Sequence, residues 1–424
     1  MDPPVADSAT AAPPRRAALA FIFVTVLVDV LAFGVIIPVL PHLVEQFVGG
    51  NVSKAAWWVG VFGVLFAAIQ FVCAPIQGAL SDRFGRRPVI LLSCLGLGAD
   101  FVFMALAPSL AWLLVGRVVS AVTAASFSTA NAYIADVTSH AERAKGYGMI
   151  GAAFGVGFIA GPLVGGVLGD IDLRLPFWFA AGMALLNFCY GLFVLPESLP
   201  PESRSARVDW SHANPLGSLK LLRSQPQVLG LAAVVFISGF AQYAHPSVFV
   251  LYGDYRYGWG QKEVGYVLAF VGFMAIVVNA GLVGPMVRRF GERRTLLLAL
   301  GCGALGFTVS GLAPEGWLFL VGVPIAALWG AANPASQALI TRQVDRRAQG
   351  RIQGALMSLV ALAGIVGPAV YAGSFGWVVS DASPLRLPGL PYLVAAAMLL
   401  LAVAIAWRHA HPAPDAPAVS EAAT

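Results

Sequence analysis

The sequence predicts an all-α membrane protein of twelve transmembrane helices in two six-helix pseudo-repeats. Hydrophobic residues make up 58% and charged residues 11% of the 424 residues, whereas soluble domains average roughly 45–50% and about 25%. The peptide GALSDRFGRR at residues 78–87 recurs in altered form as GPMVRRFGER at residues 284–293, and Gly161-Pro162 recurs as Gly367-Pro368 at the same offset of 206 residues. Two related apolar halves are typical of secondary transporters, whose site lies between the repeats.

Twelve apolar segments follow one another along the chain, each close to the roughly 20 residues that cross a bilayer core. They begin near Ala17, Trp57, Pro88, Ala111, Lys145, Leu175, Gln227, Glu263, Thr295, Trp317, Gly350 and Gly389. A polar stretch at residues 196–226 predicts a linker between a first half at 17–195 and a second half at 227–408. Residues 1–16 are expected to be a disordered cytoplasmic N-terminus, and residues 409–424 a cytoplasmic tail.

Basic residues predict the orientation of the chain in the membrane. Twenty Lys and Arg residues fall on the side that both termini share, five fall on the opposite side, and Arg117 lies within a helix. By the positive-inside rule, both termini and the linker are expected in the cytoplasm. The net charge of +5 and the pI near 9.1 are spread over alternate short loops, which argues against a nucleic-acid surface.

Four ionisable residues within the apolar segments are candidates for proton coupling, because burying a charge at a helix centre costs at least about 2.5–3.5 kcal/mol. Asp29 either carries a proton or contacts substrate, or it is satisfied permanently by a neighbouring helix. Asp100 either shares that task or holds structure. Arg117 stays charged and is expected to pair with a carboxylate. His245 titrates near physiological pH, although a lone histidine is more often structural.

Uncharged polar side chains in the apolar segments are candidates for substrate binding, because a few polar groups orient a ligand in an apolar pocket. Each of them also has a simpler interpretation as a hydrogen bond between helices. The candidates are Gln70, Asn131, Gln242, Asn279, Trp329, Asn333 and Gln337.

The loop at residues 78–87 predicts a conformational latch. When one side of the protein is shut, Asp82 is expected to pair with an arginine or with a helix N-terminus, and it separates when that side opens. The alternative is that the arginines only fix topology. Membrane topology alone does not require Gly78 and Gly85 to recur in the second half, yet they recur as Gly284 and Gly291. The latch residues in this loop are Gly78, Asp82, Arg83, Gly85, Arg86 and Arg87.

A second glycine-rich segment lies at residues 155–166 within an apolar stretch. No strand precedes it, so it does not predict a dinucleotide site. Small residues at three- and four-residue spacing instead allow helices to approach closely. The residues concerned are Gly155, Gly157, Gly161, Pro162, Gly165 and Gly166. The chain contains no GxxxxGK[ST] loop, so ATP is not the evident energy source.

These residues resemble the major facilitator superfamily and, within it, the twelve-helix drug:proton antiporters. The loop at 78–88 resembles motif A of that family, the surroundings of Arg117 resemble motif B, and residues 155–166 resemble the antiporter motif C. Residues 28–41, 116–119, 132–138, 142–144 and 152–162, together with Gln70 and Asp100, are similar to the tetracycline/proton antiporters.

The resemblance implies a major facilitator fold and a multi-pass protein of the bacterial inner membrane. It implies roles in proton or drug handling for Asp29, Asp100 and Arg117, and a latch formed by Asp82, Asp136 and Arg86. The implied function is proton-coupled export of a drug, with tetracycline as the first candidate, by alternating access. The protein is not expected to be an enzyme.

No cofactor and no metal site is implied, since the proton gradient supplies the energy, and the cargo could be a drug–divalent cation chelate. The expected partners are the small-molecule drug, protons and membrane lipids, without nucleic acid, and the sequence assigns no oligomeric state. Ala275 and Gly303 depart from the family, whose members usually carry a histidine at the first position and sometimes an aspartate at the second. Either coupling rests on Asp29, Asp100 and His245, or the substrate is not tetracycline. The alternative functions are export of another drug or metabolite in the same fold, and a non-transporting membrane sensor.

Overall fold

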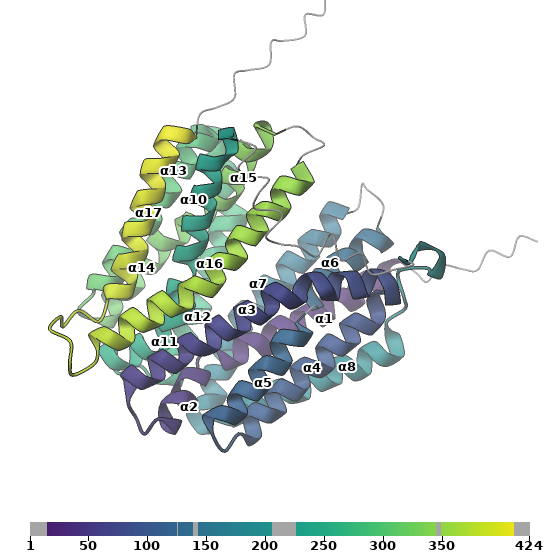
Figure 1. Cartoon of the computed structure of the whole chain (residues 1–424), viewed down its shortest axis with the longest axis horizontal. Helices are drawn as coiled ribbons and strands as arrows, with labels where there is room; N and C mark the ends of the chain where they lie inside the picture. The colour runs from purple at the N-terminus through teal and green to yellow at the C-terminus, as the bar shows by residue number, and fades with distance from the viewer. Residues whose placement is uncertain (1–14, 125, 139–142, 206–225, 345–348, 411–424) are drawn as a thin grey trace, which may run out of the picture.

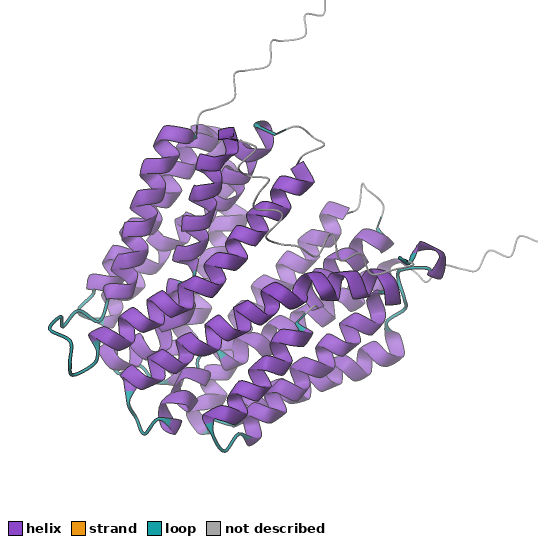
Figure 2. Cartoon of the chain, viewed as in Figure 1, coloured by secondary structure: helices purple, strands orange, loops and turns teal. Residues whose placement is uncertain are grey.

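The computed structural model describes residues 15–124, 126–138, 143–205, 226–344 and 349–410. The described residues are almost entirely helical (Figure 2). Most of the predicted tails at 1–16 and 409–424, and most of the predicted linker at 196–226, lie outside the described residues.

The helices form two groups that follow each other along the chain (Figure 1). The first group contains α1 (Arg15–Ile36), α2 (Leu40–Phe47), α3 (Val52–Phe84), α4 (Arg86–Leu106), α5 (Leu110–Thr123), α6 (Ser126–Val137), α7 (Arg143–Ile171) and α8 (Leu175–Val194), with a short 3-10 turn η1 (Pro201–Ser203). The second contains α10 (Pro226–Gln242), α11 (Ala244–Tyr257), α12 (Gln261–Ile276), the π-helical turn η2 (Val277–Leu282), α13 (Val283–Leu312), α14 (Gly316–Ala327), the 3-10 turn η3 (Leu328–Ala331), α15 (Ala332–Arg342), α16 (Gln349–Val378) and α17 (Leu390–His409).

Within the described residues, eleven helical runs are long and apolar enough to cross a membrane. One of them, Gln261–Leu312, has 52 residues and would be about 78 Å long at 1.5 Å per residue, more than twice the bilayer core of about 30 Å. Gly291 divides this run, because its φ of 73° is not helical. The run therefore supplies the eighth and ninth spans, and the predicted fold class of twelve transmembrane helices is confirmed.

The two groups interrupt their helices at equivalent places. The first span breaks after Ile36 and the seventh breaks after Gln242, 206 residues later. The fourth span breaks after Thr123, and η3 interrupts the tenth span at the corresponding position. Breaks of this kind are tolerated in membranes where the freed backbone lines a cavity or is buried in protein. Three of the four breaks do line the cavities described below.

The two groups pack together at one end of the molecule and diverge toward the other (Figure 1). At the packed end, the Ser53 hydroxyl on α3 donates to the Gly376 carbonyl on α16 at 2.6 Å. On the opposite side, a side chain on Gly166 of α7 would lie 3.0 Å from the Gly265 Cα of α12. These close approaches shut this end of the molecule.

The diverging end carries Gly85 and Gly291, the two latch-loop glycines, with φ of 104° and 73°. Toward this end, four glycines face open space: Gly78 on α3, Gly148 on α7, Gly284 on α13 and Gly354 on α16. Further along, α3 packs against α16 and α7 packs against α12. The structure is therefore closed at one end and open at the end of the latch loops.

Candidate functional site

A cavity lies between the two halves. It has a volume of about 420 Å³ and is lined from the first half by Phe33, Phe66, Gln70 and Arg117, and from the second half by Tyr243 and Ser247, among others. A second cavity of about 320 Å³ extends into the first half and shares Phe33, Phe66 and Gln70 with it. The two cavities are therefore contiguous.

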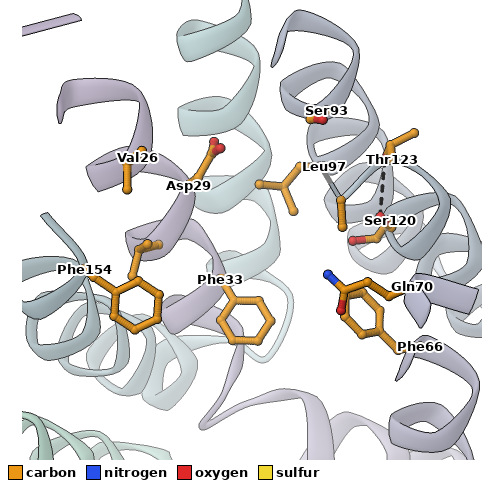
Figure 3. A pocket seen from close by; sticks show the side chains of 12 residues that line it. Val26, Asp29, Phe33, Phe66, Gln70, Ser93, Leu97, Ser120, Thr123 and Phe154 are labelled. Carbon is orange, nitrogen blue, oxygen red and sulfur yellow. Dashed lines mark hydrogen bonds between the residues drawn. The ribbon is translucent and has the colours of Figure 1, made fainter. Parts of the chain in front are cut away.

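Figure 3 shows aromatic rings around the smaller cavity together with the polar side chains of Asp29, Gln70, Ser93, Ser120 and Thr123. Phe33 of α1, Phe66 of α3 and Phe154 of α7 present their rings, while Gln70 and Asp29 supply polar atoms at the margin. Rings offer flat apolar contact area, and a small number of polar groups fixes orientation. The site is thus suited to a flat, largely apolar ligand with polar edges.

Asp29 lies on α1 at the wall of the smaller cavity. Its Oδ1 accepts a hydrogen bond from the Asn187 amide of α8 at 3.3 Å, and the Cys94 sulfur of α4 lies 3.9 Å from the same oxygen. A carboxylate in this position touches both the cavity and the protein interior. It can therefore exchange a proton with the cavity while its other contacts hold it in place.

Arg117 and Asp100 form an ion pair inside the first half. The Arg117 Nη1 lies 3.2 Å from Asp100 Oδ2, and the two side chains are 9% and 0% exposed. The guanidinium also lies over the Phe66 ring at 4.7 Å from its centroid, a favourable cation–π position. Arg117 therefore reaches the larger cavity with its charge balanced from behind by Asp100.

Gly116 explains how the pair fits. A Cβ at Gly116 would lie 2.7 Å from Asp100 Oδ1, closer than such atoms approach without displacement. Only glycine leaves the Asp100 carboxylate in place beside α5. The Gly116-Arg117 dipeptide is thus a matched unit, in which one residue makes room for the carboxylate that the next residue pairs.

His245 lies in an aromatic cluster of the second half. Its ring lies 5.4 Å from Phe249, 5.5 Å from Tyr392 and 6.0 Å from both Phe307 and Phe319, between ring centroids. Its neighbours Pro246 and Ser247 line the larger cavity, whereas His245 does not. The structure thus does not bring His245 together with Asp29 or Arg117, and its role in proton coupling stays a prediction.

Of the predicted substrate-binding residues, Gln70 lines both cavities. Three of the others make hydrogen bonds within the second half. Trp329 Nε1 donates to Ser238 Oγ at 3.0 Å, Gln337 Oε1 accepts from Gln353 Nε2 at 2.6 Å, and Asn279 Nδ2 donates to the Ala275 carbonyl at 2.8 Å. Asn131, Gln242 and Asn333 line neither of the two cavities either.

The departure at Gly303 has a structural reason. A Cβ at Gly303 would lie 2.9 Å from Trp329 Cβ and 2.8 Å from a Leu399 methyl. The Trp329 side chain therefore occupies the space in which a carboxylate at position 303 would stand. The charged side chains that line the two cavities, Asp29 and Arg117, both belong to the first half.

The latch loop holds a network around Arg86. Arg86 Nη1 lies 2.5 Å from Asp82 Oδ1 and its Nε lies 3.1 Å from Asp136 Oδ2 on α6. Arg87 donates to the Leu192 carbonyl at 2.6 Å, and Arg83 lies over the Phe84 ring. Asp82 is thus paired with Arg86 while this end of the molecule is open, whereas the sequence predicted that Asp82 separates from its partner when this side opens. The contacts lie within the first half, so opening at this end leaves them in place.

Glu197 completes this network. Its Oε1 accepts from the Arg86 backbone N–H at 2.8 Å and its Oε2 from the Arg87 N–H at 3.3 Å. A carboxylate at the N-terminus of α4 satisfies donors that lack helical partners and suits the helix dipole. Gly85 is required here, because a side chain would collide with this carboxylate. The sequence reasoning missed Glu197, although a lone acid directly after the sixth span is a visible signal.

The second half contains a counterpart with reversed charge. Glu292 Oε1 lies 2.7 Å from Arg342 Nη2. Both residues lie 206 positions after their equivalents, Arg86 and Asp136, so the cation and the carboxylate have exchanged places. The repeat therefore preserves the position of an ion pair between the third and fourth spans of each half, and inverts its polarity.

The glycine motif of α7 makes contacts on two faces. Toward α1, a Cβ at Gly161 would lie 2.7 Å from the Leu31 carbonyl oxygen, and one at Gly157 3.0 Å from the Leu31 nitrogen. Gly165 faces the α1 backbone at Val35 more closely still, and Pro162 packs on Gly34. Toward the second half, Gly155 faces Ile276 and Gly166 faces α12. The motif thus sits at the junction of the two halves.

Within the described ranges, no group of three or more His, Cys, Asp or Glu side chains is arranged to hold a metal ion. The site consists of carboxylates, an arginine, amides and aromatic rings. Such a set can bind an organic molecule and exchange protons.

Comparisons with known proteins bear on this site. A family model described as Major Facilitator Superfamily matches residues 22–368 and 283–423. Similar relatives include the tetracycline resistance protein class C of Escherichia coli, 38% identical over 91% of this chain and 95% of the relative, and class G of Vibrio anguillarum, 37% identical over 86% and 94%. Among solved structures, the human organic anion transporter MFSD10 is similar, with a TM-score of 0.68, 24% identity and coverage of 93% of this chain and 100% of that one.

Proposed function

The chain belongs to the Major Facilitator Superfamily and resembles tetracycline resistance proteins over most of its length, and from this premise we propose that it is a proton-coupled antiporter that exports tetracycline. The observation that carries the proposal is the cavity between the halves, which places Asp29, Gln70 and Arg117 around one space. The cavities have volumes of about 320 and 420 Å³, within the roughly 300–1,000 Å³ typical of small-molecule sites.

The proposed cycle uses Asp29 as the exchange group. With the cavity open at the latch-loop end, a drug enters, contacts Gln70 and the aromatic rings, and displaces the proton from Asp29. The halves then rock about the packed glycine faces, so that the drug leaves on the other side and Asp29 is reloaded. Arg117 and Asp100 remain paired, so that the guanidinium faces the cavity while Asp100 balances its charge.

The direction of transport follows from orientation. The latch-loop end carries the excess of basic residues, so it is assigned to the cytoplasm of a bacterial inner membrane, and the structure then faces inward. One positive charge moving inward across 100 mV yields about 2.3 kcal/mol. At about 1.4 kcal/mol per tenfold ratio, one proton can sustain a gradient of a neutral drug well above tenfold.

Cysteine pairs test the rocking motion. Gly78 and Gly354 face open space on α3 and α16, two helices that are in contact further toward the closed end. If the latch-loop end closes during transport, a Gly78→Cys/Gly354→Cys pair should cross-link in active membranes, and cross-linking should stop export until a reductant is added. A Gly78→Cys/Gly373→Cys pair is the control, since Gly373 lies near the closed end of α16. Equal cross-linking of both pairs would contradict the motion.

The form of the cargo is part of the proposal. Because the site offers Gln70 and one carboxylate, the drug is carried either free or as a chelate with a divalent cation that travels as cargo. Uptake into everted vesicles measured with and without Mg²⁺ separates the two. A chelate predicts that uptake stops when the divalent cation is removed, and a free drug predicts that it persists.

Export of a different drug is the second candidate, and the Gly303 packing favours it. Trp329 fills the space in which some antiporters of this group carry a carboxylate, so the second half presents a different surface to a ligand. Competition tests this directly. A series of planar multi-ring drugs should inhibit tetracycline uptake if the site is shared, whereas an absence of tetracycline uptake with transport of another compound would favour the second candidate.

A further inference from the structure

Asn187 of α8 stands directly behind Asp29. Its side chain is 4% exposed, and no residue of α8 lines either cavity. The amide Nδ2 lies 3.3 Å from Asp29 Oδ1, 3.4 Å from the Thr25 carbonyl and 3.5 Å from the Cys94 sulfur. Asn187 therefore contacts the exchange carboxylate from the side that a ligand does not reach.

One polar atom of the Asn187 side chain, the amide oxygen Oδ1, is not used in these contacts. In the described part of the chain, Asn187 Oδ1 is buried and has no hydrogen-bond partner, which is unfavourable for a buried acceptor. An asparagine offers donors on one side of its amide and an acceptor on the other. When Asp29 is ionised, Nδ2 donates to it. When Asp29 is protonated, a half-turn of the amide lets Oδ1 accept the new O–H.

We propose that Asn187 is the positioning residue of the proton site, which holds Asp29 in both protonation states and sets the pH at which it exchanges its proton. This inference rests on the proposed function, because it assigns to Asn187 the control of the group that couples export to protons. A donor that favours the ionised carboxylate lowers the pH at which the proton is released.

Two side-chain contacts of Asp29 bear on that pH, one from Asn187 and one from Cys94. On the helices packed against this part of α1, Cys94 of α4 is a described ionisable side chain that contacts Asp29. The α7 residues that approach α1 closely include Gly157, Gly161, Pro162 and Gly165. On α6, the Tyr133 hydroxyl donates to the Pro196 carbonyl at 3.1 Å. Of these two contacts, the Asn187 amide is the stronger hydrogen-bond donor and the Cys94 thiol the weaker one.

The experiment is an infrared titration of the protonated carboxyl band in the purified full-length protein, which needs no drug. The band of Asp29 is identified by its loss in Asp29→Asn. Asn187→Leu keeps the volume and removes the amide, and we expect the midpoint of the Asp29 band to move upward by about one pH unit. Cys94→Ala, which removes the sulfur and keeps the amide, should leave the midpoint unchanged.

A second variant covers the case in which Asn187→Leu fails to fold. Asn187→Ser keeps a small group that both donates and accepts, and we expect a smaller shift in the same direction. A midpoint identical to that of the wild type in whichever of these variants folds would overturn the inference, because a purely structural role changes stability and leaves the titration in place. If no band distinguishes the wild type from Asp29→Asn, then Asp29 takes no proton and the proposed coupling itself fails.

Discussion

Replacing Arg117 with leucine would leave the Asp100 carboxylate buried without its cation. Asp100 is fully buried and Arg117 is 9% exposed, with 3.2 Å between their charged atoms. The variant removes the guanidinium but keeps an apolar side chain of moderate size against the Phe66 ring. It therefore tests the ion pair more than the packing.

The size of the destabilisation can be estimated from the distance between Arg117 Nη1 and Asp100 Oδ2. Two unit charges at that separation interact by about 5 kcal/mol at an effective dielectric constant near 20, and removing one partner of a buried pair costs about 3–5 kcal/mol. We expect Arg117→Leu to lower the free energy of unfolding by about 3–5 kcal/mol. Adding Asp100→Asn removes the stranded charge, so the double variant should recover most of that loss.

The assay is reversible unfolding in mixed detergent micelles, followed by tryptophan fluorescence, for the wild type, both single variants and the double variant. The coupling between the two positions is the difference between the double variant and the sum of the singles. A double variant whose destabilisation equals the sum of the two single variants would refute the reasoning, because additive losses imply that the two charges do not interact.

Three further predictions follow from close contacts and charges. Gly116→Val should abolish export, since its Cβ would lie 2.7 Å from Asp100 Oδ1; drug uptake by everted vesicles measures this, and full uptake would contradict the fit. Gly165→Leu should prevent α7 from packing on α1 and lower the yield of folded protein, whereas Gly182→Leu, at a glycine that faces open space, should not, as monitored by size-exclusion chromatography. Glu292→Arg should lower stability by less than about 1 kcal/mol, because Arg342 is 62% exposed, and combining it with Arg342→Glu should restore the wild-type unfolding midpoint.

The spans could be predicted from the sequence because membrane crossing depends on local apolar length. The sixth segment was expected to begin near Leu175, and α8 begins there. The second was expected near Trp57 but begins at Val52, because Asn51 caps the helix by accepting from the Lys54 N–H at 2.8 Å. Apolarity alone does not mark a capping residue, so the first turn of α3 was missed.

The candidate site was only partly predictable, because it depends on contacts between distant segments. Asp29, Gln70 and Arg117 stand out as polar residues within apolar runs, and all three line the cavities. Asn187 is also a lone polar residue in an apolar run, yet its importance comes from meeting Asp29, 158 residues away in sequence. Trp329 and Gln337 have the same sequence signature and bond within the second half instead. A polar residue in a span predicts a partner but does not say which one.

The account rests on coupled exchange of drug and protons at Asp29. The direct test uses everted vesicles with an acidic lumen, in which tetracycline uptake and lumenal pH are followed together for the wild type and Asp29→Asn. The account predicts that drug enters as protons leave in the wild type, and that the folded Asp29→Asn variant shows neither movement. Undiminished proton-linked uptake by Asp29→Asn would contradict it.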